Sequence, residues 1–329
     1  MPNSGPEKAE TPAKVAVFIS GKGTNMAALL YHSRLAGSAY EIVLVAANDP
    51  HAEGLQLAKS EGAATFALSH KDMTRADHDA AMEAAAQEAE AEYIVLAGYM
   101  RILTPEFVTR WEGKMLNIHP SLLPKYPGLD THARAIEAGD AKAGATVHLV
   151  TEELDSGQTL AQSEVAIWPG DTPEKLASRV RVAEHQLYPK ALSDYVSRAS
   201  NPGYLIEKVR ALALALPETH ERESHGQAGW RAGSAKSGKY FAYFNNQHHG
   251  SPHIAVLVKT SGLDELEGLI ETQPETYFKP AFYGASGWVG VILNRPDLDW
   301  DLVSEWLARS WRVVAPKRLT KLMDAADEF

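Results

Sequence analysis

The first part of the chain alternates between short apolar runs and longer stretches whose apolar positions recur at helical spacing. The apolar runs are rich in β-branched residues, which is typical of strands buried on both faces of a sheet. We predict such strands at 14–19, 41–46, 65–68, 93–97, 114–119 and 146–150. The stretches between them predict helices near 26–31, 52–61, 76–91, 104–111 and 131–138, and one from 171 toward 198 with a candidate break at Pro189. This alternation predicts an α/β fold with a mostly parallel, doubly wound sheet and helices on both faces.

The pattern changes near residue 197. The run SRASNPG is small, polar and helix-breaking, so we predict a linker at 198–203 between a first domain at 14–197 and a second at 204–329. Residues 1–13 are polar and contain proline, and we expect a disordered start that is neither a signal peptide nor a membrane anchor. In the second domain, helical patterns at 204–216 and 299–311 and strand patterns at 239–244, 254–259 and 288–293 predict a smaller α+β fold.

Composition narrows the classes of function. The chain has no cysteine, which excludes disulfides, thiolate zinc sites and cysteine nucleophiles. The absence of cysteine allows a reducing compartment, so we expect a cytoplasmic protein. The chain also lacks an apolar run of membrane-spanning length, so we expect no membrane partner. The formal charge of −10 argues against a general polyanion binder, although a local pocket can still bind one phosphate. Residues 204–329 hold 14 basic and 16 acidic side chains, and so offer no basic face in bulk.

The strand at 114–119 ends in the sequence Asn117–Ile118–His119–Pro120. Alternate side chains of a strand share a face, so Asn117 and His119 are predicted to lie together at the strand end, where open α/β sheets bind ligands. An amide can donate to a developing oxyanion, and an imidazole can move a proton near neutral pH. A polar strand end with a solvated histidine explains the same pattern, so the pair alone does not identify a site.

Three loops carry further candidate groups. Ser20–Asn25 (SGKGTN) joins a strand to a helix, and its glycines and the helix N-terminus suit a phosphate, although a plain tight turn has the same pattern. It matches neither the dinucleotide-binding fingerprint nor the Walker loop. The apolar side chains of 99–103 suit either a slot for a flat ligand or ordinary helix–sheet packing. Asp155, in an acidic loop, either stays solvated or folds back on His119 and favours its imidazolium form.

Taken together, five segments resemble the phosphoribosylglycinamide formyltransferase family, the folate-dependent enzymes of purine synthesis. They are SGKGTN at 20–25, LAGYMRIL at 96–103, NIHPSLLPKYPG at 117–128, ELDSG at 153–157 and EHQLYP at 184–189, within a match over about 14–197. The resemblance implies that Asn117, His119 and Asp155 are catalytic. It implies ribonucleotide contacts at Gly23, Thr24, Asn25, Met26, Ala27 and Glu184, and folate contacts at Arg75, Met100, Arg101, Ile102, Leu103, Asn117, Glu152, Glu153 and Leu154.

The reaction implied by this resemblance transfers the formyl group of 10-formyltetrahydrofolate to the amine of glycinamide ribonucleotide. No metal is expected, because the chain lacks H-E-x-x-H and its histidines His51, His70, His78 and His148 are scattered. The rival on the same scaffold is a formyltetrahydrofolate hydrolase, which passes the formyl group to water and needs no ribonucleotide.

The second domain resembles a different family. LPETHE at 216–221, GWVGVIL at 287–293, LDW at 298–300 and VAPKRL at 314–319 resemble the MmcQ/YjbR-like family, whose members are suspected of DNA binding. This resemblance implies no catalytic residue. A DNA-binding regulator is therefore the non-enzymatic alternative, in competition with structural or partner-binding roles. His248, His249 and His253 are metal candidates, but adjacent residues rarely share a coordination sphere, so we expect no metal there.

Overall fold

A computed structural model describes residues 12–295 and 298–321, and the chain divides into two compact units after Val196. The predicted disordered start, 1–13, lies outside the described residues except for its last two, and Ala13 begins a strand. Helix α7 (Pro202–Leu214) starts inside the predicted linker. Asn201 caps this helix, because its side-chain oxygen accepts hydrogen bonds from the backbone N–H groups of Gly203 and Tyr204.

The described part of the first unit contains a seven-stranded sheet with the order β3-β2-β1-β4-β5-β6-β7. The strands are β1 (Ala13–Ile19), β2 (Tyr40–Ala47), β3 (Thr65–Ala67), β4 (Tyr93–Leu96), β5 (Met115–His119), β6 (Lys142–Leu149) and β7 (Thr159–Ala166). Strands β1 to β5 pair in parallel, whereas β5–β6 and β6–β7 pair antiparallel. The predicted mostly parallel α/β sheet is confirmed.

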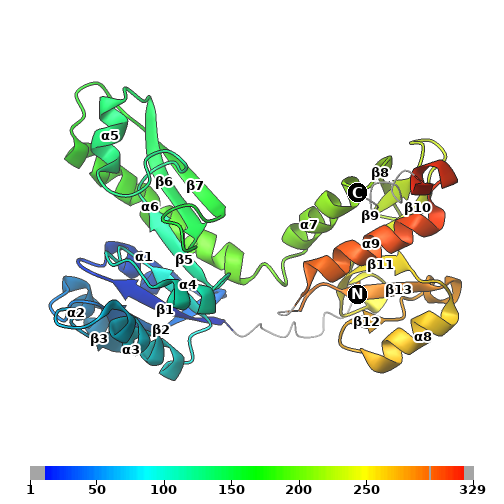
Figure 1. The fold of residues 1–329 in the computed structure, drawn as a ribbon, viewed down its shortest axis with the longest axis horizontal. Helices are drawn as coiled ribbons and strands as arrows, with labels where there is room; N and C mark the ends of the chain where they lie inside the picture. The colour runs from blue at the N-terminus through cyan, green and yellow to red at the C-terminus, as the bar shows by residue number, and fades with distance from the viewer. Residues whose placement is uncertain (1–11, 296–297, 322–329) are drawn as a thin grey trace. The chain divides into compact units, whose positions relative to one another are not determined.

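Helices cover both faces of this sheet (Figure 1). They are α1 (Thr24–Ser33), α2 (Glu53–Ser60), α3 (Arg75–Glu88), α4 (Pro105–Arg110), α5 (Thr131–Glu137) and α6 (Pro173–Val196). Alternate residues of β1 enter two separate cores: Val17 packs with side chains of α1, α2 and α6, and Phe18 packs with side chains of α3 and α4. The continuous apolar run of β1 follows from this burial on both faces.

Two elements of the first unit differ from the predictions. Helix α6 runs through Pro189 without interruption, so the predicted break there is wrong. The neighbouring Tyr188 fixes the helix on the sheet, because its buried hydroxyl donates toward the carbonyl oxygens of Leu96 and Leu116 at 3.0 and 3.1 Å. Proline removes one backbone donor, and this packing outweighs the loss. Strand β7 (TLAQSEVA) lies at the sheet edge and carries many polar residues, so the apolar pattern does not reveal it.

The second unit folds around a six-stranded antiparallel sheet with the order β12-β13-β11-β10-β9-β8. Its described elements are β8 (Thr219–Ser224), β9 (Gln227–Ala232), β10 (Lys239–Asn246), β11 (Ile254–Lys259), β12 (Tyr277–Phe278), β13 (Trp288–Ile292), α7, α8 (Leu263–Thr272), α9 (Trp300–Val314) and the 3₁₀ turns η1 (His248–Gly250) and η2 (Gly284–Ser286). Helices α7 and α9 pack on one face around Trp230, Trp306 and Trp311. This architecture confirms the predicted α+β fold of the second part of the chain.

Strand β8 (THERES) is polar along its length, so the sequence pattern does not indicate it. Across the described ranges, none of the helices combines the length and the apolar character that crossing a bilayer requires.

Candidate active site

The order of the first sheet creates a topological switch point at β1. The chain adds β2 and β3 on one side of β1 and then crosses over to place β4 on the other side. Open α/β sheets bind ligands beyond the carboxyl ends of the strands at such a point. The loops after β1 and β4 meet there, because the backbone N–H of Met100 donates to the hydroxyl oxygen of Ser20 at 2.7 Å.

A hollow of about 300 Å³ opens between these two loops. It is lined by Ser20, Gly21, Lys22, Gly23, Thr24, Asn25, Ala97, Gly98, Met100 and Arg181. Two cationic side chains and no carboxylate line it, which favours an anionic ligand. Sequence reasoning missed Arg181. It lies three residues before Glu184 on α6, and residues at that spacing share a helix face, so the predicted contact at Glu184 already pointed to it.

The start of α1 supplies backbone donors to this hollow. Gly23 has φ 68°, a left-handed conformation that suits glycine, and it caps α1 without a side-chain hydrogen bond. The first helical bond runs from the N–H of Ala27 to the carbonyl of Gly23, so the N–H groups of Thr24, Asn25 and Met26 have no acceptor within the helix. These groups and the helix dipole attract an anion. The N–H of Ala27 is already bonded and the Met26 side chain is fully buried, so Met26 offers only its backbone.

Glu184 reaches the same loop from α6. The side-chain amide of Asn25 donates to Oε2 of Glu184 at 2.9 Å, and Glu184 is buried. Burial raises the pKa of the Glu184 carboxyl, and the hydrogen bond from Asn25 and the charge of Arg181 offset only part of that rise. Within the described residues, Oδ1 of Asn25 is buried without a hydrogen-bond partner, so it can accept from a ligand hydroxyl or amine.

The variant Glu184→Gln is expected to be more stable than the wild type without ligand, and the gain should grow with pH. The amide keeps an oxygen for Asn25 and removes a carboxylate that is costly to ionise when buried. The pKa of Glu184 is raised in the folded state. The neutral carboxyl therefore makes its full contribution to the stability of the wild type below the unfolded pKa of about 4.3, and the wild type loses this contribution as the pH rises through the folded pKa. Melting temperatures between about pH 4.5 and 8 measure the effect. An equal gain in melting temperature at pH 4.5 and at pH 8, or the same gain in the exposed control Glu137→Gln, contradicts this prediction.

His119 faces two acceptors. Its Nε2 lies 2.9 Å from the carbonyl oxygen of Tyr126, and its Nδ1 lies 3.3 Å from Oδ2 of Asp155. A carbonyl and a carboxylate only accept hydrogen bonds, so both neighbours are satisfied when both ring nitrogens carry a proton. The ring is 5% exposed, and a buried imidazolium needs such a counter-charge. The geometry therefore provides an acceptor for each of the two ring nitrogens of His119.

His148 links the other two predicted catalytic residues. Its Nδ1 lies 2.8 Å from the carbonyl oxygen of Leu149, and its Nε2 lies 3.2 Å from the side-chain amide nitrogen of Asn117. The same Nε2 lies 3.5 Å from Oδ1 of Asp155. Sequence reasoning treated His148 as one of several scattered histidines. His148 lies here because the antiparallel register of β5 and β6 pairs it with Asn117. The periodicity along a single strand carries no information about this register.

Asp155 is held at the site by a loop that folds back over β6. A Cβ atom on Gly157 would lie 1.8 Å from the carbonyl oxygen of Leu149, so only glycine permits this close approach. Burial acts to raise the pKa of the Asp155 carboxyl, but the hydrogen bonds from His148 and from the backbone N–H of Gly128 at 2.9 Å, with the charge of His119, outweigh it and hold that pKa below its usual value. Asp155 is therefore ionised at neutral pH.

The apolar residues predicted to contact a folate differ in the solvent exposure of their side chains. Met100, Ile102 and Leu154 are exposed by 69%, 62% and 60%, which is high for apolar side chains. Leu103 is largely buried in the core with Phe107, so its side chain offers little surface to a ligand.

The remaining predicted folate residues are polar. Glu152 is tied to α4, because the Thr109 hydroxyl donates to its Oε1 at 3.3 Å, and Glu153 is exposed next to it. Nε of Arg101 is buried without a partner among the described residues. Arg75 is the first residue of α3, and within the described ranges it makes no hydrogen bond to the loops at 98–103 or 151–155. The described part of the structure thus shows no hydrogen bond between Arg75 and the other predicted folate residues.

In the part of the chain that the structure describes, no three His, Asp or Glu side chains are arranged to hold a metal ion.

Comparisons with known proteins match the two units separately. A family model described as formyl transferase matches residues 13–192, and a YjbR model matches 214–313. A phosphoribosylglycinamide formyltransferase from Haemophilus influenzae is 44% identical over 177 residues, which cover 54% of this chain and 84% of that protein. A trifunctional purine biosynthetic protein adenosine-3 from Gallus gallus is 46% identical over 58% of this chain, which spans only 19% of that relative.

A solved structure of phosphoribosylglycinamide formyltransferase from Brucella melitensis resembles this chain with a TM-score of 0.55 and 47% sequence identity, over 57% of this chain and 97% of that one. The family model covers more than half of the chain, and its matched residues include the loops after β1 and β4, the end of β5 and the Asp155 loop. Through residues 13–192, the chain belongs to the formyl transferase family.

Proposed function

We propose that the first unit transfers the formyl group of 10-formyltetrahydrofolate to the amine of glycinamide ribonucleotide. The observation that carries the proposal is the joint presence, beyond one end of the first sheet, of an anion-binding hollow and of the cluster Asn117, His119, His148 and Asp155. The relatives named above for this reaction support it, since they match the same segment. The absence of cysteine fits a reducing compartment and supports a cytoplasmic location.

In this proposal the substrate phosphate binds at the start of α1 and between Lys22 and Arg181. Backbone N–H groups and two cations are the donors that a phosphate dianion requires. The unpaired Oδ1 of Asn25 and the carboxyl of Glu184 then meet the polar part of the ribonucleotide that follows the phosphate. The folate binds beside the exposed apolar side chains Met100 and Ile102, which suit a flat ring.

The chemistry needs an oxyanion site and a path for one proton. The substrate amine attacks the formyl carbon, the carbonyl oxygen gains negative charge, and the bond from that carbon to the folate nitrogen then breaks. Asn117 donates to the oxyanion through its side-chain amide, and the Nε2–H of His119 turns from the Tyr126 carbonyl to the same oxygen. The proton lost by the amine passes through Asp155, directly or through water, to the departing folate nitrogen, so the proton count balances.

Replacing Arg181 with glutamine is expected to raise the KM for the ribonucleotide by about tenfold, because a charge-assisted contact to phosphate is lost. The change should leave kcat and the KM for the folate nearly unchanged, since neither the folate nor the reacting atoms contact this side chain. Steady-state kinetics and calorimetric titration with the ribonucleotide measure both quantities. The control is Lys175→Gln, an exposed cation on the same helix outside the hollow. Equal KM values in the two variants contradict the assigned phosphate site.

A further inference from the structure

The sheet of the second unit has two faces of different chemistry. One face packs on α7 and α9, and the other carries an aromatic cluster, defined here as Tyr240, Tyr243, Phe278, Tyr283 and Trp288. The ring centroid of Tyr243 lies 4.8 Å from that of Tyr240 and 5.3 Å from those of Tyr283 and Trp288. Rings in such contact restrict one another's movement, so the aromatic cluster forms a well-packed surface on this face of the sheet.

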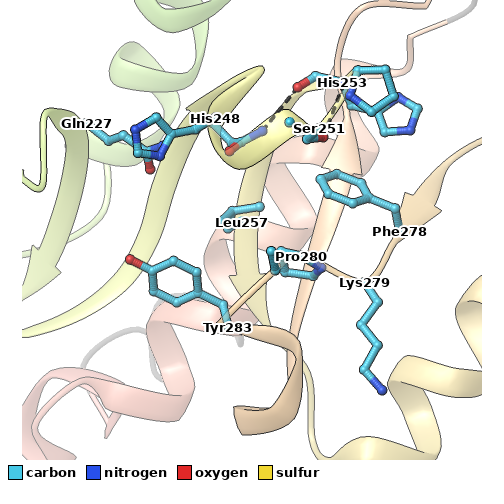
Figure 2. Close-up of a pocket in the computed structure, with 13 residues that line it drawn as sticks. Gln227, His248, Ser251, His253, Leu257, Phe278, Lys279, Pro280 and Tyr283 are labelled. Carbon is cyan, nitrogen blue, oxygen red and sulfur yellow. Dashed lines mark hydrogen bonds between the residues drawn. The ribbon is translucent and has the colours of Figure 1, made fainter. Parts of the chain in front are cut away.

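A hollow of about 280 Å³ lies beside the aromatic cluster. It is lined by Gln227, Asn245, His248, Gly250, Ser251, Pro252, His253, Leu257, Phe278, Lys279, Pro280, Ala281 and Tyr283. Figure 2 shows Ser251 on one side, Pro280 on the other and Leu257 between them. His253 and Phe278 close one end, and Tyr283 stands at the other. The volume is close to the lower limit of ligand pockets and suits a single ring system.

The ends of the hollow present aromatic surfaces. Phe278 packs tightly against β13, because a Cβ atom on Gly290 would lie only 2.1 Å from its Cε1 atom. The rings of His253 and Phe278 have centroids 5.0 Å apart. With the ring of Tyr283 at the opposite end, the hollow offers π surfaces that match a flat aromatic ligand better than a branched aliphatic one.

Three polar side chains at the hollow keep unused hydrogen-bonding capacity. The amide of Gln227, the ring of His253 and the hydroxyl of Tyr283 make no hydrogen bond to other described residues. Burial lowers the pKa of His253, so the ring is neutral at pH 7 and has one donor and one acceptor nitrogen. The edge of a heteroaromatic ring presents the complementary mixture of acceptors and donors.

The charge of the lining favours an anion at the mouth. Among the described residues that line the hollow, Lys279 is the one with a formal charge, and none is Asp or Glu. Figure 2 shows the Lys279 ammonium extending away from the interior, so it can meet a group that projects from the hollow rather than the ring inside it.

The segment between Pro280 and Tyr283 is strained. Phe282 has φ 66°, and the N–H of Tyr283 donates to the carbonyl of Ala281 at 2.8 Å, which together form a tight γ-turn of the rare positive-φ kind. Phe282 is 81% exposed, so burial of its ring does not offset this strain. Backbone strain of this kind persists most often at ligand-binding and other functional sites.

We propose that this hollow binds a small molecule made of one flat heteroaromatic or aromatic ring system and an anionic group, either a phosphate or a carboxylate. The ring lies between Phe278 and Tyr283, its polar edge bonds Gln227 and His253, and its anionic group meets Lys279 at the mouth. The site is separate from the formyl-transfer machinery and does not depend on the function proposed for the first unit.

The test uses the full chain and two probes, adenosine 5′-monophosphate for the phosphate arm and 4-aminobenzoate for the carboxylate arm. Calorimetry and ligand-observed NMR measure binding to the wild type and to Ala281→Trp, in which an exposed alanine at the mouth becomes a side chain large enough to fill the hollow. The matched control is Ala285→Trp, an exposed alanine of η2 outside the lining. We expect at least one probe to bind, with a dissociation constant raised about tenfold or more by Ala281→Trp and unchanged by Ala285→Trp.

A second pair of variants covers the case in which Ala281→Trp unfolds the second unit. Lys279→Ala should weaken the same probe several-fold, whereas Lys239→Ala, an exposed lysine outside the hollow, should not. Adenosine, which lacks the anionic group, should bind both lysine variants equally. The proposal is overturned if neither probe binds the wild type, or if Ala281→Trp and Lys279→Ala both bind the probes as tightly as their controls.

Discussion

Replacing His119 with alanine is expected to lower kcat for formyl transfer by a factor on the order of 10² or more, with little change in either KM. The imidazolium acts on an oxyanion that exists only in the transition state, so its loss changes the barrier rather than substrate binding. It is also the cation that Asp155 faces at 3.3 Å, so the variant leaves a buried carboxylate without this charge partner. Steady-state kinetics with both substrates varied give the required separation of kcat from KM.

The control for this variant is His51→Ala, which removes an exposed histidine outside the site. Near-normal turnover of His119→Ala, with a melting temperature close to that of the wild type, contradicts the assignment of His119. A fall in kcat that the control variant reproduces also contradicts it.

Asp155→Asn is expected to lower kcat by a similar factor, on the order of 10², because the amide is nearly isosteric but neutral. The carboxylate faces Nδ1 of His119 and Nε2 of His148 and accepts from the N–H of Gly128, so the substitution removes the negative charge shared by two rings. The amide oxygen can still accept from Gly128. The loop should therefore keep its position while the charge balance and the proton path are lost.

Asp194→Asn is the matched control, since Asp194 is an exposed acid on α6 paired with Lys190, and surface pairs contribute little. Retained kcat in Asp155→Asn contradicts the proton-transfer role. A rise in the ribonucleotide KM with unchanged kcat points to substrate binding instead, which also contradicts it.

Much of this site could be predicted from patterns among residues close together in the sequence. The alternation that placed Asn117 and His119 on one face is a local property of β5, and the glycine loop between β1 and α1 is equally local. The edge between β5, β6 and β7 is different, because β7 is polar and its register with β6 is decided by tertiary packing. His148 reaches Asn117 through the register of β5 with β6, so no periodicity along one strand could indicate its role.

The family resemblance supplied residues that local patterns could not, and the structure qualifies some of them. The Met26 side chain is fully buried, so its implied contact reduces to its backbone, and the Leu103 side chain offers little exposed surface. Ala27 has already used its N–H within α1. Arg181 shows the converse, since the resemblance did not name it although it lines the hollow and lies one helical turn before Glu184 on α6.

The most direct test of the central claim follows a ¹³C label in the formyl group of 10-formyltetrahydrofolate by NMR during turnover with glycinamide ribonucleotide. We expect the label to appear in an amide of the ribonucleotide in a 1:1 ratio with the tetrahydrofolate released, and almost no folate to be consumed without the ribonucleotide. Label that accumulates as free formate at the same rate with and without the ribonucleotide contradicts the proposed transferase activity, because the formyl group would then pass to water.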